Sequence, residues 1–288
     1  MSAVVDTRHM HSTEVAVVTG AGGMRSIGRA VAVRLAQDGY DVVISDYQRP
    51  DDRVADDERA ASWAGLASVT QEIERLGRRA LPVVCDLTNA SDIEHLIGQA
   101  VADFGRLDVL VNTARAFTYP EQVEAINLAV EAWDHVNAVN VRGPMLTCRA
   151  AARAMIDANV NGRIVNVSSL ASHKPTAGSA PYCCSKAALD MLTQVLALEL
   201  GPHGIRVNAV NPGTIATNRV SLMERDRAAL EGIALADFRQ QQLAVAAANN
   251  PLRRVGEPDD VADVVAFLVA DGSRHISGQC IDITGGPA

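Results

Sequence analysis

Short β-branched segments alternate with longer amphipathic segments along almost the whole chain. The expected strands carry few polar residues in their interiors, as strands buried on both faces do, and cover residues 15–19, 42–46, 81–85, 109–112, 164–167, 205–210 and 279–283. The expected helices cover 26–39, 66–77, 90–104, 122–158 (at least two helices), 182–200 and 258–270. Because strand–helix–strand units are right-handed and build parallel sheets, the pattern predicts an α/β fold: a doubly wound parallel sheet with helices on both faces.

The 288 residues fit one such domain, since the sequence contains no internal repeat and no long linker. Residues 1–13 are predicted to form a flexible tail, and 14–288 a single domain. Two segments interrupt the alternation. Residues 47–61 carry mixed charge and are interpreted as a solvated surface insertion. Residues 214–250 form a long connection with apolar positions at helical spacing, and we expect a lid over a substrate near the C-terminal third.

Charge and composition exclude several classes of function. The net charge is −8 and no basic block is present, which argues against nucleic acid or an anionic membrane surface as a partner. No apolar run approaches the ~20 residues that span a bilayer, and no secretory signal pattern is visible. Five cysteines without a C-x-x-C pair indicate a reduced, cytoplasmic protein, and seven unclustered histidines argue against a metal site.

A glycine-rich turn follows the first expected strand and precedes a helix. In this context glycines permit a tight turn, and the helix N-terminus offers unpaired N–H groups to a pyrophosphate. Asp46 ends the second strand 18 positions after Gly28, which is close to the spacing of a carboxylate that binds ribose. The candidates for nucleotide binding are Gly20, Gly22, Arg25, Ser26, Ile27 and Asp46.

Two residues bear on the choice of dinucleotide. The Asp46 carboxylate can accept the ribose hydroxyls of NAD and would repel the 2′-phosphate of NADP. Arg25, in the glycine-rich turn, is a cation that could reach such a phosphate. We expect NAD to be favoured, with NADP as the open alternative.

Tyr182 and Lys186 are four residues apart and share one face of a helix that begins near Pro181. A phenol is a poor base at its usual pKa of about 10. A neighbouring ammonium group favours the phenolate and brings that pKa toward neutrality, so the pair is suited to proton transfer.

Further motifs surround this pair. Ser169 ends an expected strand 13 residues before Tyr182, and Asn140 lies in a Val-Asn-Val-Arg-Gly run. Asn211-Pro212-Gly213 and a C-terminal Ile-Thr-Gly-Gly segment follow. With these motifs the chain resembles the short-chain dehydrogenase/reductase family, of the type with a Tyr-x-x-x-Lys pair, over about residues 14–286.

The resemblance implies a Rossmann-type domain and a role for each matching position. Tyr182 is the general acid/base, Ser169 hydrogen-bonds the substrate oxygen, Lys186 holds the nicotinamide ribose and lowers the pKa of Tyr182, and Asn140 supports the proton path. Tyr182 and Lys186 therefore count among the cofactor contacts too. The other positions that the resemblance places around the cofactor are Asp86, Leu87, Asn112, Pro212, Gly213, Ile215 and Thr217.

The chain also departs from the family pattern. The glycine-rich turn is two residues longer than usual, and Ser26 stands where the middle glycine is expected. Its Arg-Ser-Ile run is similar to a branch that includes enoyl reductases, yet that branch spaces its Tyr and Lys by seven. Arg115 replaces a glycine near the cofactor, and it either binds an anionic or polar group of a substrate or pairs with an acidic neighbour. The candidate substrate contacts are Arg115, Tyr119, Leu170 and Met223.

The resemblance implies an NAD(P)-dependent oxidoreductase, an alcohol dehydrogenase or ketoreductase, that interconverts a secondary alcohol and a ketone. The alternatives are a non-catalytic nucleotide-binding protein and a dihydrodiol dehydrogenase or other enzyme acting on CH–CH groups. The expected partner is a small alcohol or ketone. The 182–200 helix is apolar beyond one stripe, which together with the resemblance predicts a homotetramer or homodimer.

Overall fold

Seven strands form one parallel sheet in the computed structural model, which describes residues 13–50, 54–116, 123–217 and 222–287. Each strand lies within two residues of its expected position. The strands are β1 (Val15–Thr19), β2 (Asp41–Asp46), β3 (Ala80–Val84), β4 (Val109–Asn112), β5 (Arg163–Val167), β6 (Arg206–Pro212) and β7 (Cys280–Ile283).

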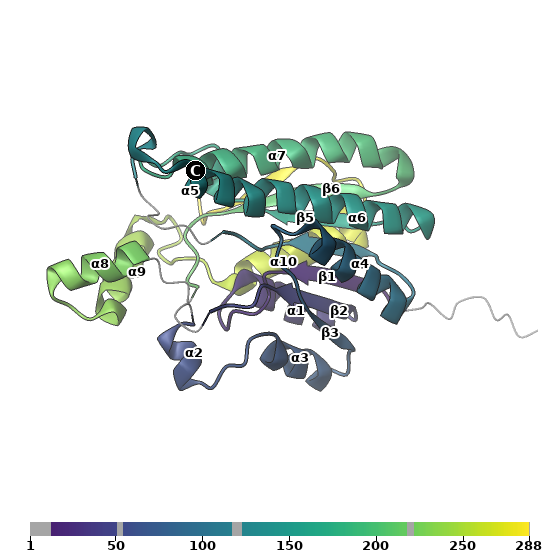
Figure 1. Cartoon of the computed structure of the whole chain (residues 1–288), viewed down its shortest axis with the longest axis horizontal. Coiled ribbons are helices and arrows are strands. Elements are labelled where there is room, and N and C mark those ends of the chain that lie inside the picture. The colour runs from purple at the N-terminus through teal and green to yellow at the C-terminus, as the bar shows by residue number, and fades with distance from the viewer. Residues whose placement is uncertain (1–12, 51–53, 117–122, 218–221, 288) are drawn as a thin grey trace, which may run out of the picture.

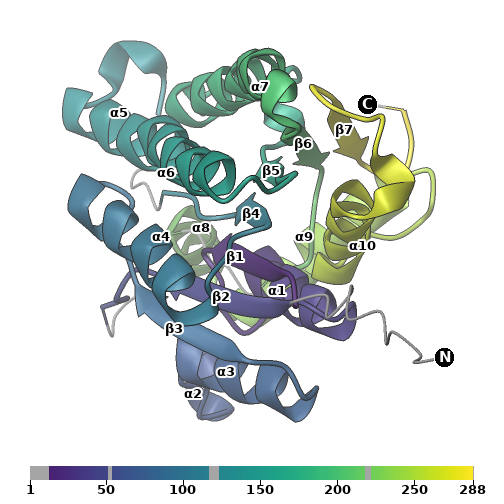
Figure 2. The ribbon, with the colours of Figure 1, turned by 90° about the vertical axis from the view of Figure 1, so that its right-hand side faces the viewer.

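The strand order is β3-β2-β1-β4-β5-β6-β7, so the order reverses between β1 and β4. At such a switch point the connections on either side leave in opposite directions, and a crevice opens beyond the carboxyl ends of the strands. Figure 2 shows the sheet between two layers of helices. The predicted single-domain, doubly wound Rossmann-type fold is therefore confirmed.

Three helices cover each face of the sheet. One face is covered by α1 (Ile27–Gln37), α3 (Leu66–Arg75) and α10 (Pro258–Val269), and the other by α4 (Ala90–Phe104), α6 (Gly143–Asp157) and α7 (Ala180–Leu200). None of the helices in the described ranges is both long and apolar enough to cross a lipid bilayer.

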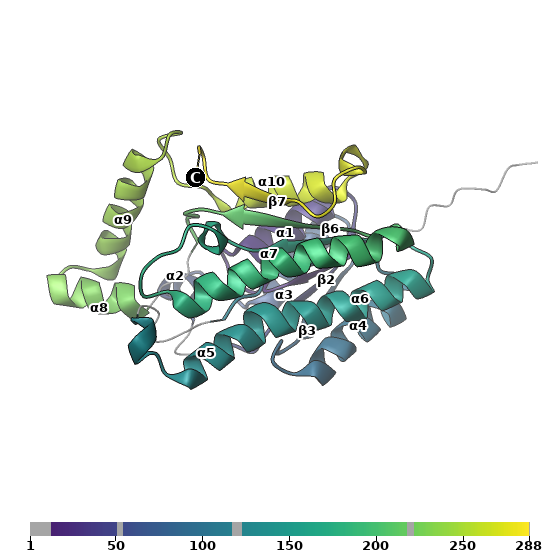
Figure 3. The same cartoon turned by 90° about the horizontal axis from the view of Figure 1, so that it is seen from above.

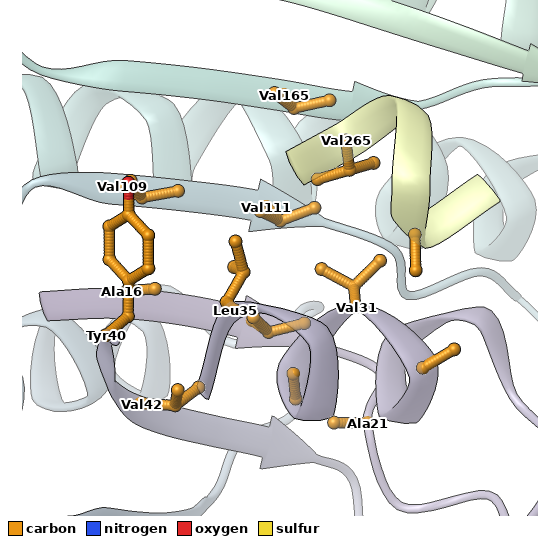
Figure 4. Packing of buried hydrophobic residues seen from close by; sticks show 14 of the residues in the cluster. Ala16, Ala21, Val31, Leu35, Tyr40, Val42, Val109, Val111, Val165 and Val265 are labelled. Carbon is orange, nitrogen blue, oxygen red and sulfur yellow. The ribbon is translucent and has the colours of Figure 1, made fainter. Parts of the chain in front are cut away.

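Alternate strand residues supply two separate cores, because successive side chains of a strand point to opposite faces. Ala16 and Val18 of β1 pack toward α1 and α10, whereas Val15 and Val17 pack toward α4 and α6. In Figure 4, Leu35 and Val31 of α1 point at the valines of β4 and β5. All of these side chains are almost fully buried, which explains the nearly continuous apolar strand sequences.

Several short elements lie at the carboxyl ends of the strands. They are α2 (Asp56–Ala60), the 3-10 turn Ala125–Asn127, α5 (Val130–Asn137), the π-helical turn Ala138–Arg142, the 3-10 turn Leu170–Ser172, α8 (Leu222–Glu231) and α9 (Leu235–Asn249). Figures 1 and 3 show α8 and α9 extending from this end of the sheet, within the expected lid. The remaining 3-10 turns are Gly201–His203 and Asp271–Ser273.

Two segments are predicted to lie outside the regular fold, the N-terminal tail and residues 47–61. The tail at 1–13 lies outside the described residues apart from its last residue. The interpretation of 47–61 as a solvated insertion holds for most of its described residues but is wrong at Glu58 of α2, which has 0% of its surface exposed. Its carboxylate contacts the glycine-rich turn, which lies far from it in sequence.

Candidate active site

A cavity of about 550 Å³ opens at the carboxyl ends of the strands, on the side of the switch point. Residues from the ends of β1, β2, β4, β5 and β6 line it together with the beginnings of α1 and α7. Fourteen predicted site residues line this one cavity: Gly20, Ser26, Ile27, Asp46, Asp86, Leu87, Arg115, Ser169, Tyr182, Lys186, Pro212, Gly213, Ile215 and Thr217.

The remaining predicted residues lie elsewhere. Tyr119 and the side chain of Met223 lie outside the described part of the structure. The other predicted residues that do not line the cavity are Gly22, Arg25, Asn112, Asn140 and Leu170.

The glycine-rich turn packs too closely for side chains at two positions. Gly20 has φ +70°, and a Cβ placed on it would lie 2.7 Å from Cα of Ala114. A Cβ on Gly28 would overlap the carbonyl oxygen of Gly20 and Oγ1 of Thr113. These two glycines let α1 begin directly against the loop that follows β4.

Ser26 has a structural reason to replace the expected glycine. It is the N-cap of α1, and its Oγ accepts a hydrogen bond of 3.1 Å from the Arg29 N–H. Because Ser26 and Ile27 line the cavity, the positive end of the α1 dipole faces it. The backbone there fits a pyrophosphate, despite the altered sequence of the turn.

Asp46 lies at the end of the cavity nearest to β2. Its Oδ2 accepts a hydrogen bond of 2.8 Å from the Gly22 N–H, and its Oδ1 accepts one of 2.9 Å from the Tyr47 N–H. Burial raises the pKa of the Asp46 carboxyl group. The hydrogen bond from the Gly22 N–H and the positive charge of Arg49 act to lower it, but the effect of burial is larger. Each carboxylate oxygen keeps a second lone pair, so the residue can still accept a ribose hydroxyl.

Arg25, the cation on which the NADP alternative rested, does not line the cavity. The side chain is about half exposed, and its Nη2 lies 3.6 Å from Oε2 of Glu257. A different cation, Arg49, lines the cavity close to Asp46.

Asn112 is part of a buried network below the cavity, not a wall of it. Its Nδ2 donates to Oδ1 of Asn166 at 2.9 Å, and its Oδ1 accepts from Oγ1 of Thr147 at 2.8 Å. Asn166 in turn donates to Oγ1 of Thr193 on α7. The network connects β4 and β5 to α6 and α7, so the Asn112 side chain positions the strand ends, and its contact with the cofactor stays a prediction.

Tyr182 and Lys186 lie one turn apart near the beginning of α7. The ammonium group of Lys186 lies 5.8 Å from the centroid of the Tyr182 ring and donates a hydrogen bond of 2.9 Å to the carbonyl oxygen of Val167. Ser169, just after β5, forms a hydrogen bond with the Tyr182 side chain. The beginning of α7 and the segment just after β5 therefore bring three of the four predicted catalytic side chains into one cluster.

Arg115 adds a second cation to this cluster. Its guanidinium carbon lies 4.7 Å from the centroid of the Tyr182 ring. Burial acts to raise the pKa of Tyr182, but the charges of Arg115 and Lys186 and the hydrogen bond with Ser169 outweigh it, so the net pKa is lowered. Burial lowers the pKa of Lys186. A phenol with a lowered pKa is suited to act as a general base.

Asn140 lies behind the cluster in the π-helical turn Ala138–Arg142. It is buried, its Oδ1 accepts from the Ala116 N–H at 2.8 Å, and its Nδ2 donates to Oγ of Ser185 at 3.1 Å. Single π-helical turns are common at functional sites. Here the turn brings Asn140 between the Arg115 loop and α7, where it supports both.

Sequence reasoning missed several residues of the site. Arg49 and Glu58 were included in a mixed-charge segment, and their apolar neighbour Trp63 was the available sign that part of it is buried. On α9, Arg239 Nη2 donates to the carbonyl oxygen of Thr217 at 2.6 Å, which joins this helix to the Pro212–Thr217 turn. No cluster of three or more potential metal ligands occurs among the residues that the structure describes.

Known proteins share these features over nearly the whole chain. A family model described as "Enoyl-(Acyl carrier protein) reductase" matches residues 20–287. A cyclohexanol dehydrogenase of Rhodococcus sp. (strain TK6) is 37% identical over 276 residues, covering 95% of each protein. A human (3R)-3-hydroxyacyl-CoA dehydrogenase is 35% identical over 272 residues, covering 94% of each.

Solved structures agree with the sequence comparisons. An NAD+-bound xylitol dehydrogenase superposes with a TM-score of 0.78 at 31% identity, covering 96% of this chain and all of the other. An actinorhodin polyketide ketoreductase with NADPH superposes with a TM-score of 0.80 at 29% identity, covering 95% and 97%. The sheet, the cavity and these similarities together establish that the chain belongs to the short-chain dehydrogenase/reductase family of oxidoreductases.

Proposed function

We propose that the protein is an NAD-dependent oxidoreductase that interconverts a secondary alcohol and a ketone, with Tyr182 as the general acid/base. The observation that carries this proposal is the position of Tyr182 between two cations, Lys186 and Arg115, in the same cavity as the glycine-rich turn and Asp46. Two relatives are named as dehydrogenases, of cyclohexanol and of (3R)-3-hydroxyacyl-CoA, and this supports an alcohol as substrate.

The side chains of the cluster divide the proton chemistry among them. The Tyr182 phenolate accepts the proton of the substrate hydroxyl in oxidation, and the Tyr182 phenol returns it to the carbonyl oxygen in reduction. Ser169 hydrogen-bonds the same substrate oxygen and orients it toward Tyr182. Lys186 stabilises the phenolate and holds a ribose hydroxyl, while Asn140 keeps the Arg115 loop and α7 in register. The nicotinamide group, when bound, supplies the hydride chemistry.

The choice of NAD rests on Asp46. A carboxylate at the end of β2 suits the two hydroxyls of an adenosine ribose and repels a 2′-phosphate. The pairing of Arg25 with Glu257 supports the same choice, because it directs Arg25 away from the cavity. Relatives of known structure carry NAD+ in one case and NADPH in another, so the family alone favours neither.

A calorimetric titration with NADH and, separately, NADPH tests the cofactor half of the proposal. We expect NADH to bind more tightly. A preference for NADPH would contradict the role of Asp46 and favour a ketone reductase. Binding of neither would contradict the dehydrogenase and favour a non-catalytic member of the family.

The helices α8 and α9 are proposed to form the lid over the substrate. Arg239 on α9 donates to the Thr217 carbonyl and lies 3.8 Å from Glu224 on α8, so one side chain connects both helices to the turn that borders the cavity. Lids of this kind exclude water and select the substrate.

Leu170, one of the predicted substrate contacts, does not line the cavity. Arg115, which does line it, remains our candidate substrate contact.

Arg115→Ala is expected to move the acid limb of the pH profile for alcohol oxidation to higher pH. The Arg115 charge favours the phenolate of Tyr182, so its loss raises the pKa of Tyr182 and leaves less base at neutral pH. We expect kcat/KM at neutral pH to fall by roughly tenfold and to recover in alkaline solution. Arg115→Lys, the matched control, keeps the charge and should show a smaller shift. An unmoved profile in Arg115→Ala would contradict this role.

Reduction of a carbon–carbon double bond is the second candidate, because the matching family model is described as an enoyl reductase. The spacing of Tyr182 and Lys186 by four residues argues against it. Incubation of the protein with NADH and an α,β-unsaturated thioester distinguishes the two reactions, since only an enoyl reductase would consume NADH without forming an alcohol.

We also propose a homodimer or homotetramer. Met191, Val195 and Leu198 of α7 have 59%, 41% and 80% of their surface exposed, and their spacing puts them on one helix face. Leu198→Asp is expected to lower the molar mass measured by light scattering to that of a smaller assembly. Glu199→Asp is the control on the same helix and should keep the wild-type mass. A wild-type protein that elutes as a monomer would contradict the proposal.

A further inference from the structure

The segment between β2 and α3 holds the elongated glycine-rich turn through a buried carboxylate. Glu58 of α2 is fully buried, and its Oε1 accepts a hydrogen bond of 2.8 Å from the Met24 N–H. Its Oε2 accepts one of 2.8 Å from Nη1 of Arg49 and one of 3.3 Å from the Ala55 N–H. Met24 belongs to this elongated turn.

Arg49 connects this carboxylate to the ribose end of the cavity. Its Nη2 donates to the carbonyl oxygen of Gly22 at 3.1 Å, and Nε1 of Trp63 donates to the same oxygen at 2.8 Å. The N–H of Gly22 is the group that donates to Asp46. Arg49, Glu58 and Asp46 all line the cavity. A continuous set of hydrogen bonds therefore leads from Asp46 through Gly22 and Arg49 to Glu58.

A guanidinium group this close to Asp46 is, by its chemistry, a binding group for a 2′-phosphate, since Arg pairs with phosphate through parallel hydrogen bonds. The ion pair of Arg49 with Glu58 opposes this binding of a phosphate. Only 17% of the Arg49 side chain is exposed and none of the Glu58 side chain is, so solvent screens their attraction little. Both ends of the guanidinium are directed at protein oxygens.

We propose that Glu58 is a specificity-determining residue that makes the cavity selective for NAD by binding Arg49. This inference rests on the proposed binding of a nicotinamide dinucleotide. With the pair intact, a 2′-phosphate meets the carboxylates of Asp46 and Glu58 while the Arg49 charge is compensated. Without the Glu58 charge, Arg49 becomes a phosphate-binding group.

Glu58→Gln tests the proposal with little change of shape. The amide oxygen of Gln can still accept from the Met24 N–H, so the turn keeps this support. The amide nitrogen in place of Oε2 carries no charge and cannot accept from Arg49 or from the Ala55 N–H. Calorimetric titration should show the dissociation constant of NADPH falling by roughly tenfold, as one charge-assisted contact to phosphate would produce. The dissociation constant of NADH should change less than about threefold.

Two further variants show whether the gain in NADPH affinity depends on Arg49. The double variant Arg49→Gln/Glu58→Gln should lose the gain for NADPH. Glu257→Gln is the matched control, because it frees the other candidate cation, Arg25, from its carboxylate partner. It should leave the ratio of the two dissociation constants unchanged. A gain in Glu257→Gln comparable to that in Glu58→Gln would overturn the proposal in favour of Arg25.

The remaining outcomes separate this inference from the proposed function. A wild-type protein that binds neither dinucleotide contradicts both. If the wild-type protein binds NADH, two results contradict the inference alone. Either Glu58→Gln keeps the wild-type preference between NADH and NADPH, or its gain in NADPH affinity persists in the double variant that lacks Arg49. If Glu58→Gln does not fold, Arg49→Gln is measured instead. This substitution leaves the Glu58 charge uncompensated, so it should weaken the binding of NADPH more than that of NADH. A larger loss of NADH affinity than of NADPH affinity would overturn the proposal.

Discussion

Tyr182→Phe is expected to lower turnover by about 10³-fold and to leave the dissociation constant of NADH nearly unchanged. The substitution removes one hydroxyl group from the cluster, and with it the atom that we propose exchanges a proton with the substrate oxygen. The ring remains, and so do its contacts with Arg115 and Lys186. The glycine-rich turn and Asp46, which we expect to bind the adenosine half, are not touched.

Steady-state kinetics and calorimetry measure the two halves of this prediction separately. Tyr40→Phe is a suitable control, because its ring lies in the core beside Ala16 and Val109 (Figure 4) and does not line the cavity. It should keep the wild-type turnover. A Tyr182→Phe variant with wild-type turnover would show that another group transfers the proton.

Gly28→Ala is expected to weaken NADH binding by about a hundredfold, which corresponds to about 2.7 kcal/mol. An added Cβ overlaps the Gly20 carbonyl oxygen and the Thr113 hydroxyl group, so α1 has to move away from the turn. That displacement removes the N–H groups of the helix N-terminus from the place where the pyrophosphate is expected. We also expect a loss of stability of about 1–3 kcal/mol, as in other overpacked sites.

Gly98→Ala is the matched control for this variant. Gly98 lies in α4, and a Cβ added there has nothing within 4 Å. This substitution should raise stability by roughly 0.5–1 kcal/mol, because alanine favours a helix more than glycine does. Gly98→Ala should bind NADH as the wild type does. Equal NADH affinities in Gly28→Ala and Gly98→Ala would contradict the proposed phosphate site.

The strands and long helices were predictable from sequence because they depend on local patterns. A strand buried on both faces needs an apolar run, and β1 and β4 are apolar at every residue except the last, which is Thr19 in β1 and Asn112 in β4. The catalytic pair was predictable for the same reason, since Tyr182 and Lys186 lie on one helix turn. The π-helical turn at Asn140 was not, because its geometry depends on contacts with Ala116 and Ser185.

Charged residues were the least predictable part of the site. Glu58 lies in a segment of mixed charge that resembles a solvated surface, yet it is fully buried because Arg49 and the Met24 N–H compensate it. Arg25 has the position of a phosphate ligand in the sequence, yet it pairs with Glu257 just before α10. The contacts of Glu58 with Met24 and of Arg25 with Glu257 join residues distant in the chain, and no local pattern contains that information.

Transfer of a labelled hydride tests the central claim most directly. The wild type and Tyr182→Phe are incubated with NAD+ and a set of secondary alcohols deuterated at the carbinol carbon, and deuterium in the reduced cofactor is measured by mass spectrometry. The set includes cyclohexanol and 3-hydroxyacyl thioesters, which relatives are named for. We expect labelled NADH from the wild type with at least one alcohol and almost none from Tyr182→Phe. A wild-type protein that binds NADH but labels it from no alcohol, or a variant that labels it equally fast, would contradict the account.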